Sequence, residues 1–137
     1  MTGTDPRAGT RLPPRDFGPL TMTDIVRYQG ASGDLNPMHH DDELARGAGY
    51  PASFGVGMLN AGYLATYCTE HFGTDSVRRF RTRFRRVVFR GAVVTARGVI
   101  TRVFDVEGES RVEVRLTLTD TDGATVVEGM AEFVIRR

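Results

Sequence analysis

The chain has 137 residues, 40% of them apolar, which suits one ordinary domain with a single core. Its 18 basic and 17 acidic residues leave a formal net charge of +1, so the overall charge does not indicate a polyanionic partner. No run of residues approaches the roughly 20 apolar positions of a membrane span, and the first residues lack the apolar block of a signal peptide, so we expect a cytoplasmic protein.

We expect residues 1–16 to form a flexible lead-in, because proline, glycine, threonine and arginine dominate this segment. The folded domain is then expected over residues 17–137, with neither an internal repeat nor a linker. Cys68 is the only cysteine, which excludes an internal disulfide. Its apolar surroundings indicate a packed core thiol rather than a nucleophile.

Three helices are expected in the first half of the domain. The first falls within residues 20–34, with Thr21 or Thr23 as its cap and glycines at its end. The second covers residues 41–47, where an aspartate at the start suits the positive end of a helix. The third, over residues 57–73, is apolar or small on nearly every face of its first turns and is therefore expected to be buried all round.

After residue 76 the pattern changes from helix to strand. Phe80 and Phe84 alternate with arginines, as in a strand with one face in water, and we expect both rings to serve the core. Turn-forming residues at 120–123 predict a hairpin. The expected strands lie near residues 78–86, 92–104, 111–120 and 124–135. Since antiparallel strands can cover a buried helix by curving around it, we predict an α+β fold, with an antiparallel β-sheet wrapped around the long central helix.

The segment SGDLNPMHH, residues 32–40, follows the first expected helix and combines an acid, an amide and two imidazoles with residues that favour turns. Asp34 and His39 are five residues apart, and Pro37 stiffens the link between them. An irregular loop of this length can turn both side chains toward one small volume. A water molecule shared between a carboxylate and an imidazole would be oriented and polarised there.

The longer segment ASGDLNPMHHDDELARGAGYPASFGVGML resembles the signature of the MaoC-like hydratases and dehydratases, which include (R)-specific enoyl-CoA hydratases and related 3-hydroxyacyl-thioester dehydratases. The motif Ser-Gly-Asp-x-Asn-Pro-x-His is matched at every defined position from Ser32 to His39, and the order of elements over residues 17–135 also fits. The resemblance implies a single hot dog fold and a hydro-lyase acting on acyl thioesters. One difference is Val56-Gly57-Met58, where the family usually has His-Gly-Met.

Hydration of an enoyl thioester needs a base for water, a proton donor for the α-carbon and stabilisation of the thioester oxygen. Asp34 and His39 can divide the first two roles, and Asn36 can hold the loop or the carboxylate. Gly57, near the positive end of the third helix, can direct its backbone N–H at the thioester carbonyl as an oxyanion hole. The resemblance implies the same dyad and the same oxyanion donor. We expect Ser32 to support the loop together with Asn36. This chemistry requires neither a metal nor a redox cofactor.

Other polar residues receive ordinary interpretations. We expect His40 to be a loop residue and His71 to be a helix-end residue. A metal site built from His39, His40 and the two following aspartates is not favoured, because adjacent histidines rarely converge on one ion. The arginines of residues 78–86 are interpreted as a solvated strand face, since the phenylalanines on the opposite face cannot stack bases beside them. Contact of one or two of them with the phosphates of coenzyme A or with an acyl carrier protein is the alternative.

We therefore predict a hydratase or dehydratase that interconverts trans-2-enoyl and (R)-3-hydroxyacyl thioesters of coenzyme A or acyl carrier protein. The alternatives are a non-catalytic acyl-binding subunit of a hetero-oligomeric dehydratase, which Val56 supports, and a hot dog thioesterase. A homodimer, or a heterodimer with a related hot dog subunit, is expected through pairing of sheet edges. Neither a nucleic acid nor a membrane is expected as a partner.

Overall fold

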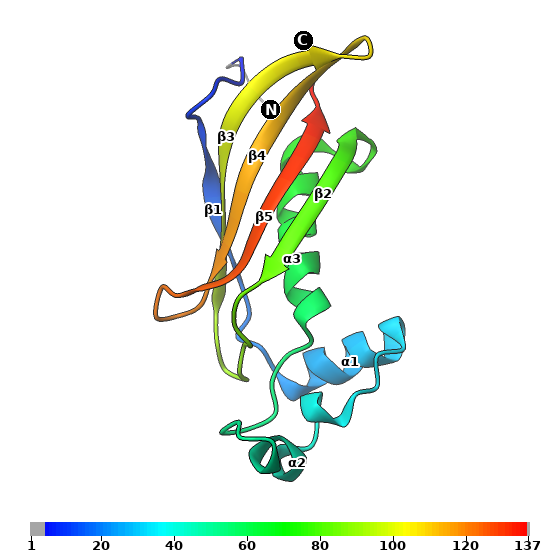
Figure 1. Cartoon of the computed structure of the whole chain (residues 1–137), viewed down its shortest axis with the longest axis vertical. Helices are drawn as coiled ribbons and strands as arrows, with labels where there is room; N and C mark the ends of the chain where they lie inside the picture. The colour runs from blue at the N-terminus through cyan, green and yellow to red at the C-terminus, as the bar shows by residue number, and fades with distance from the viewer. Residues whose placement is uncertain (1–4, 137) are drawn as a thin grey trace.

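The computed structural model describes residues 5–136. Within them, one five-stranded antiparallel sheet in the order β1-β3-β4-β5-β2 curves around a long helix, α3 (Figure 1). The shorter helices α1 and α2 lie beyond one end of the sheet, below the start of α3 in the view of Figure 1. The strands are Arg11–Phe17 (β1), Val77–Phe84 (β2), Val94–Val106 (β3), Glu109–Thr119 (β4) and Thr125–Val134 (β5), and the helices are Met22–Ser32 (α1), Asp42–Gly47 (α2) and Gly57–Phe72 (α3).

The three strands β3, β4 and β5 form the predicted meander. Val114 in the middle of β4 lies opposite Ile100 of β3 and Ala131 of β5, and all three side chains are buried against α3. Between β4 and β5, the Asp120 carboxylate accepts hydrogen bonds from the backbone N–H groups of Asp122 and Ala124, at 3.0 and 2.9 Å. This turn chemistry sets the register of the hairpin, because it fixes where β5 begins.

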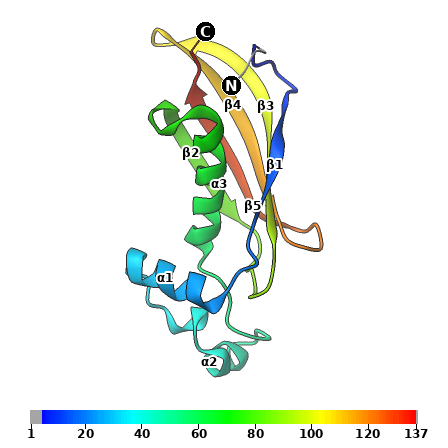
Figure 2. The same cartoon turned by 180° about the vertical axis from the view of Figure 1, so that it is seen from behind.

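The core lies between the concave face of the sheet and one face of α3. Leu64, Tyr67 and Cys68 of α3 are fully buried there, which confirms the core position of the thiol. The prediction that α3 is buried all round is wrong for this single chain, since Met58 is 56% exposed and Figure 2 shows the helix open on the side away from the sheet. Small residues on that side, such as Gly62, account for the misleading pattern.

The sheet begins earlier than the predicted domain boundary. Residues 11–17 form β1, which pairs with β3, and Leu12 is buried in the core. The hydroxyl of Tyr67 donates a hydrogen bond to the backbone carbonyl of Pro13 at 2.9 Å, which ties β1 to α3. The expected flexible lead-in is therefore wrong for residues 11–16, and for residues 1–4 that expectation lies outside the described residues.

The two short helices begin where their capping residues predict. Thr21 caps α1 in a reciprocal capping box with Asp24, in which each side chain accepts the other residue's backbone N–H. Gly33 ends α1 with φ of 78°, a left-handed conformation that favours glycine. Asp41 caps α2 by accepting the N–H of Leu44 at 3.0 Å. These caps confirm the predicted helices and fix the two ends of the loop that carries the motif.

Candidate active site

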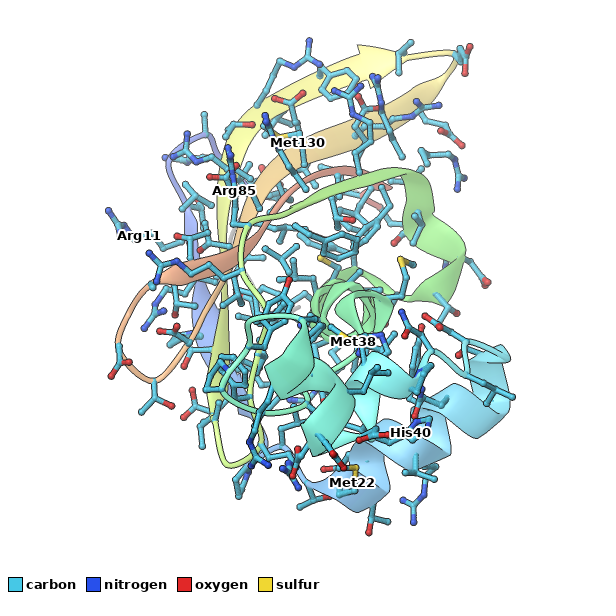
Figure 3. All side chains as sticks on the ribbon, turned by 60° about the horizontal axis from the view of Figure 1, so that its bottom comes forward. Arg11, Met22, Met38, His40, Arg85 and Met130 are labelled. Atoms are coloured by element: carbon cyan, nitrogen blue, oxygen red, sulfur yellow. The ribbon has the colours of Figure 1, made fainter. Side chains whose placement is uncertain are left out.

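The segment between α1 and α2 carries the motif and lies below the N-terminus of α3. It contains one short 3-10 turn, Pro37–His39, and Figure 3 views this end of the molecule with Met38 and His40 labelled. The Asn36 side-chain oxygen accepts the N–H of Met38 at 3.0 Å and thereby caps the turn. Proline at the first position of the turn needs no hydrogen-bond acceptor, so the local sequence suits this conformation.

His39 points inward from this turn and is only 8% exposed. Its Nδ1 lies 2.9 Å from the backbone carbonyl oxygen of Phe54, and its ring meets the Phe54 ring edge to face at a centroid distance of 5.2 Å. Because a carbonyl oxygen can only accept, Nδ1 carries the proton in this contact. In the neutral imidazole, Nε2 is therefore left with a free lone pair and can act as a base.

Asp34 lies on the exposed rim of the same loop. Its backbone N–H donates to the Ser32 hydroxyl at 3.2 Å, and its Oδ1 accepts the N–H of Asn36 at 3.2 Å. These contacts fix the carboxylate at the turn and leave its Oδ2 without a hydrogen-bond partner among the described residues. Ser32 and Asn36 thus support the loop backbone. The Asn36 side chain caps the 3-10 turn, while its backbone N–H, and not its side-chain amide, holds the Asp34 carboxylate.

Gln29 was not identified from the sequence, yet its side chain reaches from α1 and holds the loop by hydrogen bonds. It is 2% exposed on the inner face of α1, where its Nε2 donates to the backbone carbonyls of Asp34 and Asn36 at 3.0 and 3.1 Å. Its Oε1 accepts from Nδ1 of His40 at 2.9 Å, which gives His40 a supporting role in the loop. The available signal was an amide four residues after Ile25, on the apolar side of the helix.

A second group of contacts holds the carbonyl that orients His39. Asp42 accepts the backbone N–H and the hydroxyl of buried Ser53 at 2.9 and 2.7 Å, and it also accepts from Arg90 at 2.8 Å. The Ser53 backbone N–H, followed by the Ser53 hydroxyl and Arg90, holds the pKa of the Asp42 carboxyl well below its usual range. Phe54 follows Ser53 and pairs with Phe89 in an isolated antiparallel bridge. The Phe54 carbonyl is therefore fixed from both sides.

Gly57 is the first residue of α3, so its N–H has no acceptor within the helix and lies at the positive helix end. A Cβ at this position would lie 3.6 Å from the ring of Phe84, which is ordinary contact, so the fold itself leaves room for alanine. Phe84 is 48% exposed, which makes the prediction that it serves the core wrong, whereas Phe80 does pack against the core. Val56 precedes Gly57 and is buried in the core without capping the helix.

Residues 5–136 contain neither a cluster of metal-ligating side chains nor a membrane-spanning helix. No group of three or more histidine, cysteine, aspartate or glutamate side chains is arranged to hold a metal ion there. In the same part of the chain, no helix has the length and apolar character needed to cross a membrane.

A curved antiparallel sheet around one long helix is the hot dog fold, and solved structures confirm it. The (R)-hydratase from A. caviae involved in PHA biosynthesis is similar with a TM-score of 0.85 and 20% identity, covering 98% of this chain and 100% of that chain. One chain of the ChsH1-ChsH2 complex from Mycobacterium tuberculosis is similar with a TM-score of 0.82 and 24% identity, covering 99% of this chain and 100% of that chain. At these identities the likeness establishes the fold.

The family follows from the sequence comparisons. The model of the MaoC like domain matches residues 5–122, and the chain belongs to this family of hydratases and dehydratases. A probable enoyl-CoA hydratase 2 from Dictyostelium discoideum is 32% identical over 72 residues, which are 50% of this chain. The match spans only 24% of that relative, which is a much longer protein. The resemblance stated from the motif is thus confirmed at the level of the family.

Proposed function

We propose that the protein is a cytoplasmic hydro-lyase that interconverts trans-2-enoyl and (R)-3-hydroxyacyl thioesters of coenzyme A or acyl carrier protein. The observation that carries the proposal is the hydrogen bond from His39 Nδ1–H to the Phe54 carbonyl, because it leaves Nε2 as a base on a nearly buried ring. Membership of the MaoC-like family supports the reaction class.

In the hydration direction, the Asp34 carboxylate and His39 Nε2 would hold one water molecule. As the water oxygen bonds to the β-carbon of the enoyl group, the dyad takes one water proton and supplies a proton to the α-carbon. The electron pair passes through the thioester carbonyl, whose oxygen becomes negative in the transition state. The N–H of Gly57 at the start of α3 would stabilise that oxygen. Dehydration is the reverse sequence and uses the same groups.

Val56 supports one alternative, in which the chain is a non-catalytic acyl-binding subunit of a larger dehydratase. Its side chain is buried in the core and makes no polar contact with the loop ahead of α3. The loop nevertheless has other supports, because Gly55 donates its N–H to the Val88 carbonyl at 2.7 Å next to the Phe54 bridge. This backbone pairing favours a preserved site.

The test is the loss of enoyl absorbance when the purified chain meets crotonyl-CoA and longer trans-2-enoyl-CoA substrates. We expect Asp34→Asn and His39→Ala to lower kcat by at least about a hundredfold, as general acid–base catalysis requires. A parallel assay for free thiol distinguishes hydration, which keeps the thioester, from a thioesterase, which releases coenzyme A. Variants as active as the wild type would contradict the assignment of the dyad.

We also propose that the protein works as a dimer, joined by sheet edges to a second copy or to a related hot dog subunit. A sheet edge presents unpaired backbone groups that a neighbouring strand can satisfy. One chain of a hetero-complex and an (R)-hydratase both share this fold. The carrier, coenzyme A or acyl carrier protein, would bind where the acyl thioester enters beside α3.

A further inference from the structure

The two edges of the sheet are chemically different. β1 carries Pro13 and Pro14 next to each other, and its pairing with β3 is irregular between Leu12 and Arg15. Proline lacks an N–H and blocks continuous pairing, so this edge is protected against strand addition. β2, Val77–Phe84, contains no proline and ends the sheet on the other side. It is therefore the edge on which a further strand can be added.

The outer face of β2 is lined by arginines. Arg81 lies opposite Met130 of β5, which in turn lies opposite Arg115 of β4. Val114 and Leu116, the neighbours of Arg115 in β4, are buried against α3 on the concave face. Arg115, Met130 and Arg81 must therefore point to the opposite, convex face, which is the outer face of the sheet. Arg79 and Arg83 are two residues away from Arg81 on either side and share that face.

The carboxylates nearest to these arginines already form ion pairs with other arginines. Glu128, opposite Arg83, accepts from Arg85 at 2.9 Å, and Glu132, opposite Arg79, lies 3.5 Å from Arg111. Of the three outer-face arginines, Arg79 has a carboxylate at the limit of an ion pair, Glu132 at 4.0 Å, whereas Arg78, at the irregular start of the strand, pairs with Glu109 at 2.7 Å. Arg81 and Arg83 have no carboxylate within 4.0 Å among residues 5–136. The edge strand thus presents excess positive charge to any strand that pairs with it.

Pairing with a second copy would oppose like charges in every register. Directly opposite residues of antiparallel strands share one face, so a continuous sheet must place outer-face residues of one β2 opposite outer-face residues of the other. With Arg81 opposite its own equivalent, Arg79 faces Arg83. A shift by two residues again sets arginine against arginine. Like charges directly opposite each other destabilise strand pairing, and low salt strengthens the effect.

We propose that the β2 edge binds a different polypeptide, whose own edge strand carries carboxylates at alternate positions facing Arg79, Arg81 and Arg83. The free backbone groups of β2 supply the affinity, and the arginines select an acidic partner strand over a second copy. This inference specifies the partner in the dimer part of the proposed function. It does not depend on the reaction, and its test measures mass rather than activity.

A charge-reversed chain can stand in for the acidic partner. The variant Arg79→Glu/Arg81→Glu/Arg83→Glu should self-associate as poorly as the wild type, because its edge is uniformly negative. Mixed with the wild type at low salt, it should form a one-to-one heterodimer at least about tenfold tighter than either homodimer, as measured by sedimentation velocity and native mass spectrometry. High salt should weaken the heterodimer.

The matched control reverses two arginines on the same convex face but on interior strands, Arg97→Glu/Arg115→Glu, and should give no tighter heterodimer with the wild type. Circular dichroism of each variant checks folding. If the glutamate variant fails to fold, Arg79→Gln/Arg81→Gln/Arg83→Gln replaces it and should self-associate more tightly than the wild type. A tight wild-type homodimer insensitive to salt and to the glutamine changes would overturn the proposal. A mixture of the wild type and the glutamate variant that associates no more tightly than either protein alone would also overturn it.

Discussion

Replacement of Gln29 by methionine tests the organisation of the loop below the proposed dyad. Methionine has nearly the same volume and keeps the apolar packing of α1, but it removes three hydrogen bonds: two donated to the carbonyls of Asp34 and Asn36, and one accepted from His40. A hydrogen bond contributes about 1 kcal/mol net, and the bonded groups lie in exposed residues that water can reach, so we expect a loss of about 2–3 kcal/mol.

The assay is equilibrium unfolding in urea. With a slope of about 1–3 kcal/mol/M for a small domain, the expected loss lowers the midpoint by roughly 0.7–3 M without changing the slope. Arg27→Met is the matched control, since Arg27 is exposed on the same helix and forms neither a hydrogen bond nor an ion pair with the loop among the described residues; its midpoint should stay within about 0.3 M of the wild type. A Gln29→Met midpoint equal to that of the control would refute the reasoning.

Further predictions concern packing, capping and ionisation. Leu64→Ala should cost about 2–5 kcal/mol in urea unfolding, because Leu64 is fully buried between α3 and the sheet, and Thr21→Ala should cost about 1 kcal/mol through loss of the α1 cap. Burial raises the pKa of the Cys68 thiol to about 12, so a thiol reagent should react with Cys68 only in denaturant, and rapid labelling of the native chain would contradict its placement. The pKa of the Asp42 carboxyl is lower in the folded chain than in the unfolded chain, where it is near 4, so the ionised carboxylate stabilises the fold above about pH 4. This stabilisation is lost as the pH falls and the carboxylate is protonated. Asp42→Asn should therefore reduce the drop in melting temperature between about pH 6 and about pH 3. An equal drop in both proteins would contradict this role.

Asp42 also provides a test of how His39 is oriented. Asp42→Asn should loosen Ser53 and thereby the Phe54 carbonyl, whereas Asp41→Asn keeps an oxygen to cap α2 and makes no contact with Ser53. Nitrogen NMR of the His39 ring reports which ring nitrogen carries the proton. We expect the Nδ1–H form in the wild type and Asp41→Asn, and a mixture of the two forms in Asp42→Asn. The same ring state in all three proteins would show that Asp42 does not position His39.

The sequence predicted those elements whose pattern is local. The alternation around Phe80, the turn residues at 120–123 and the caps Thr21 and Asp41 each specify a neighbouring backbone conformation, and all appear in the structure. The motif at residues 32–40 was likewise recognisable because its spacing is short. Together these local signals predicted an antiparallel sheet wrapped around a helix, and the family resemblance of the motif implied the hot dog fold.

Features that depend on distant contacts were not predictable in this way. β1 contains two prolines and few apolar residues, and it is a strand because β3 pairs with it and Tyr67 contacts Pro13. Gln29 supports the loop by donating to backbone carbonyls, and because every residue has a backbone carbonyl, the sequence does not indicate these partners. The Asp42–Arg90 pair joins residues 48 positions apart. The exposure of Phe84 depends on where the sheet ends relative to α3, which alternation alone does not specify.

The most direct test of the proposed reaction follows the water oxygen itself. The purified chain is incubated with a trans-2-enoyl-CoA in isotopically labelled water, and the product is examined by mass spectrometry and chiral chromatography, beside His39→Ala. The proposal predicts an intact (R)-3-hydroxyacyl-CoA that carries one labelled oxygen on the β-carbon, formed by the wild type and not by the variant. Free coenzyme A, or an equal rate with His39→Ala, would contradict it.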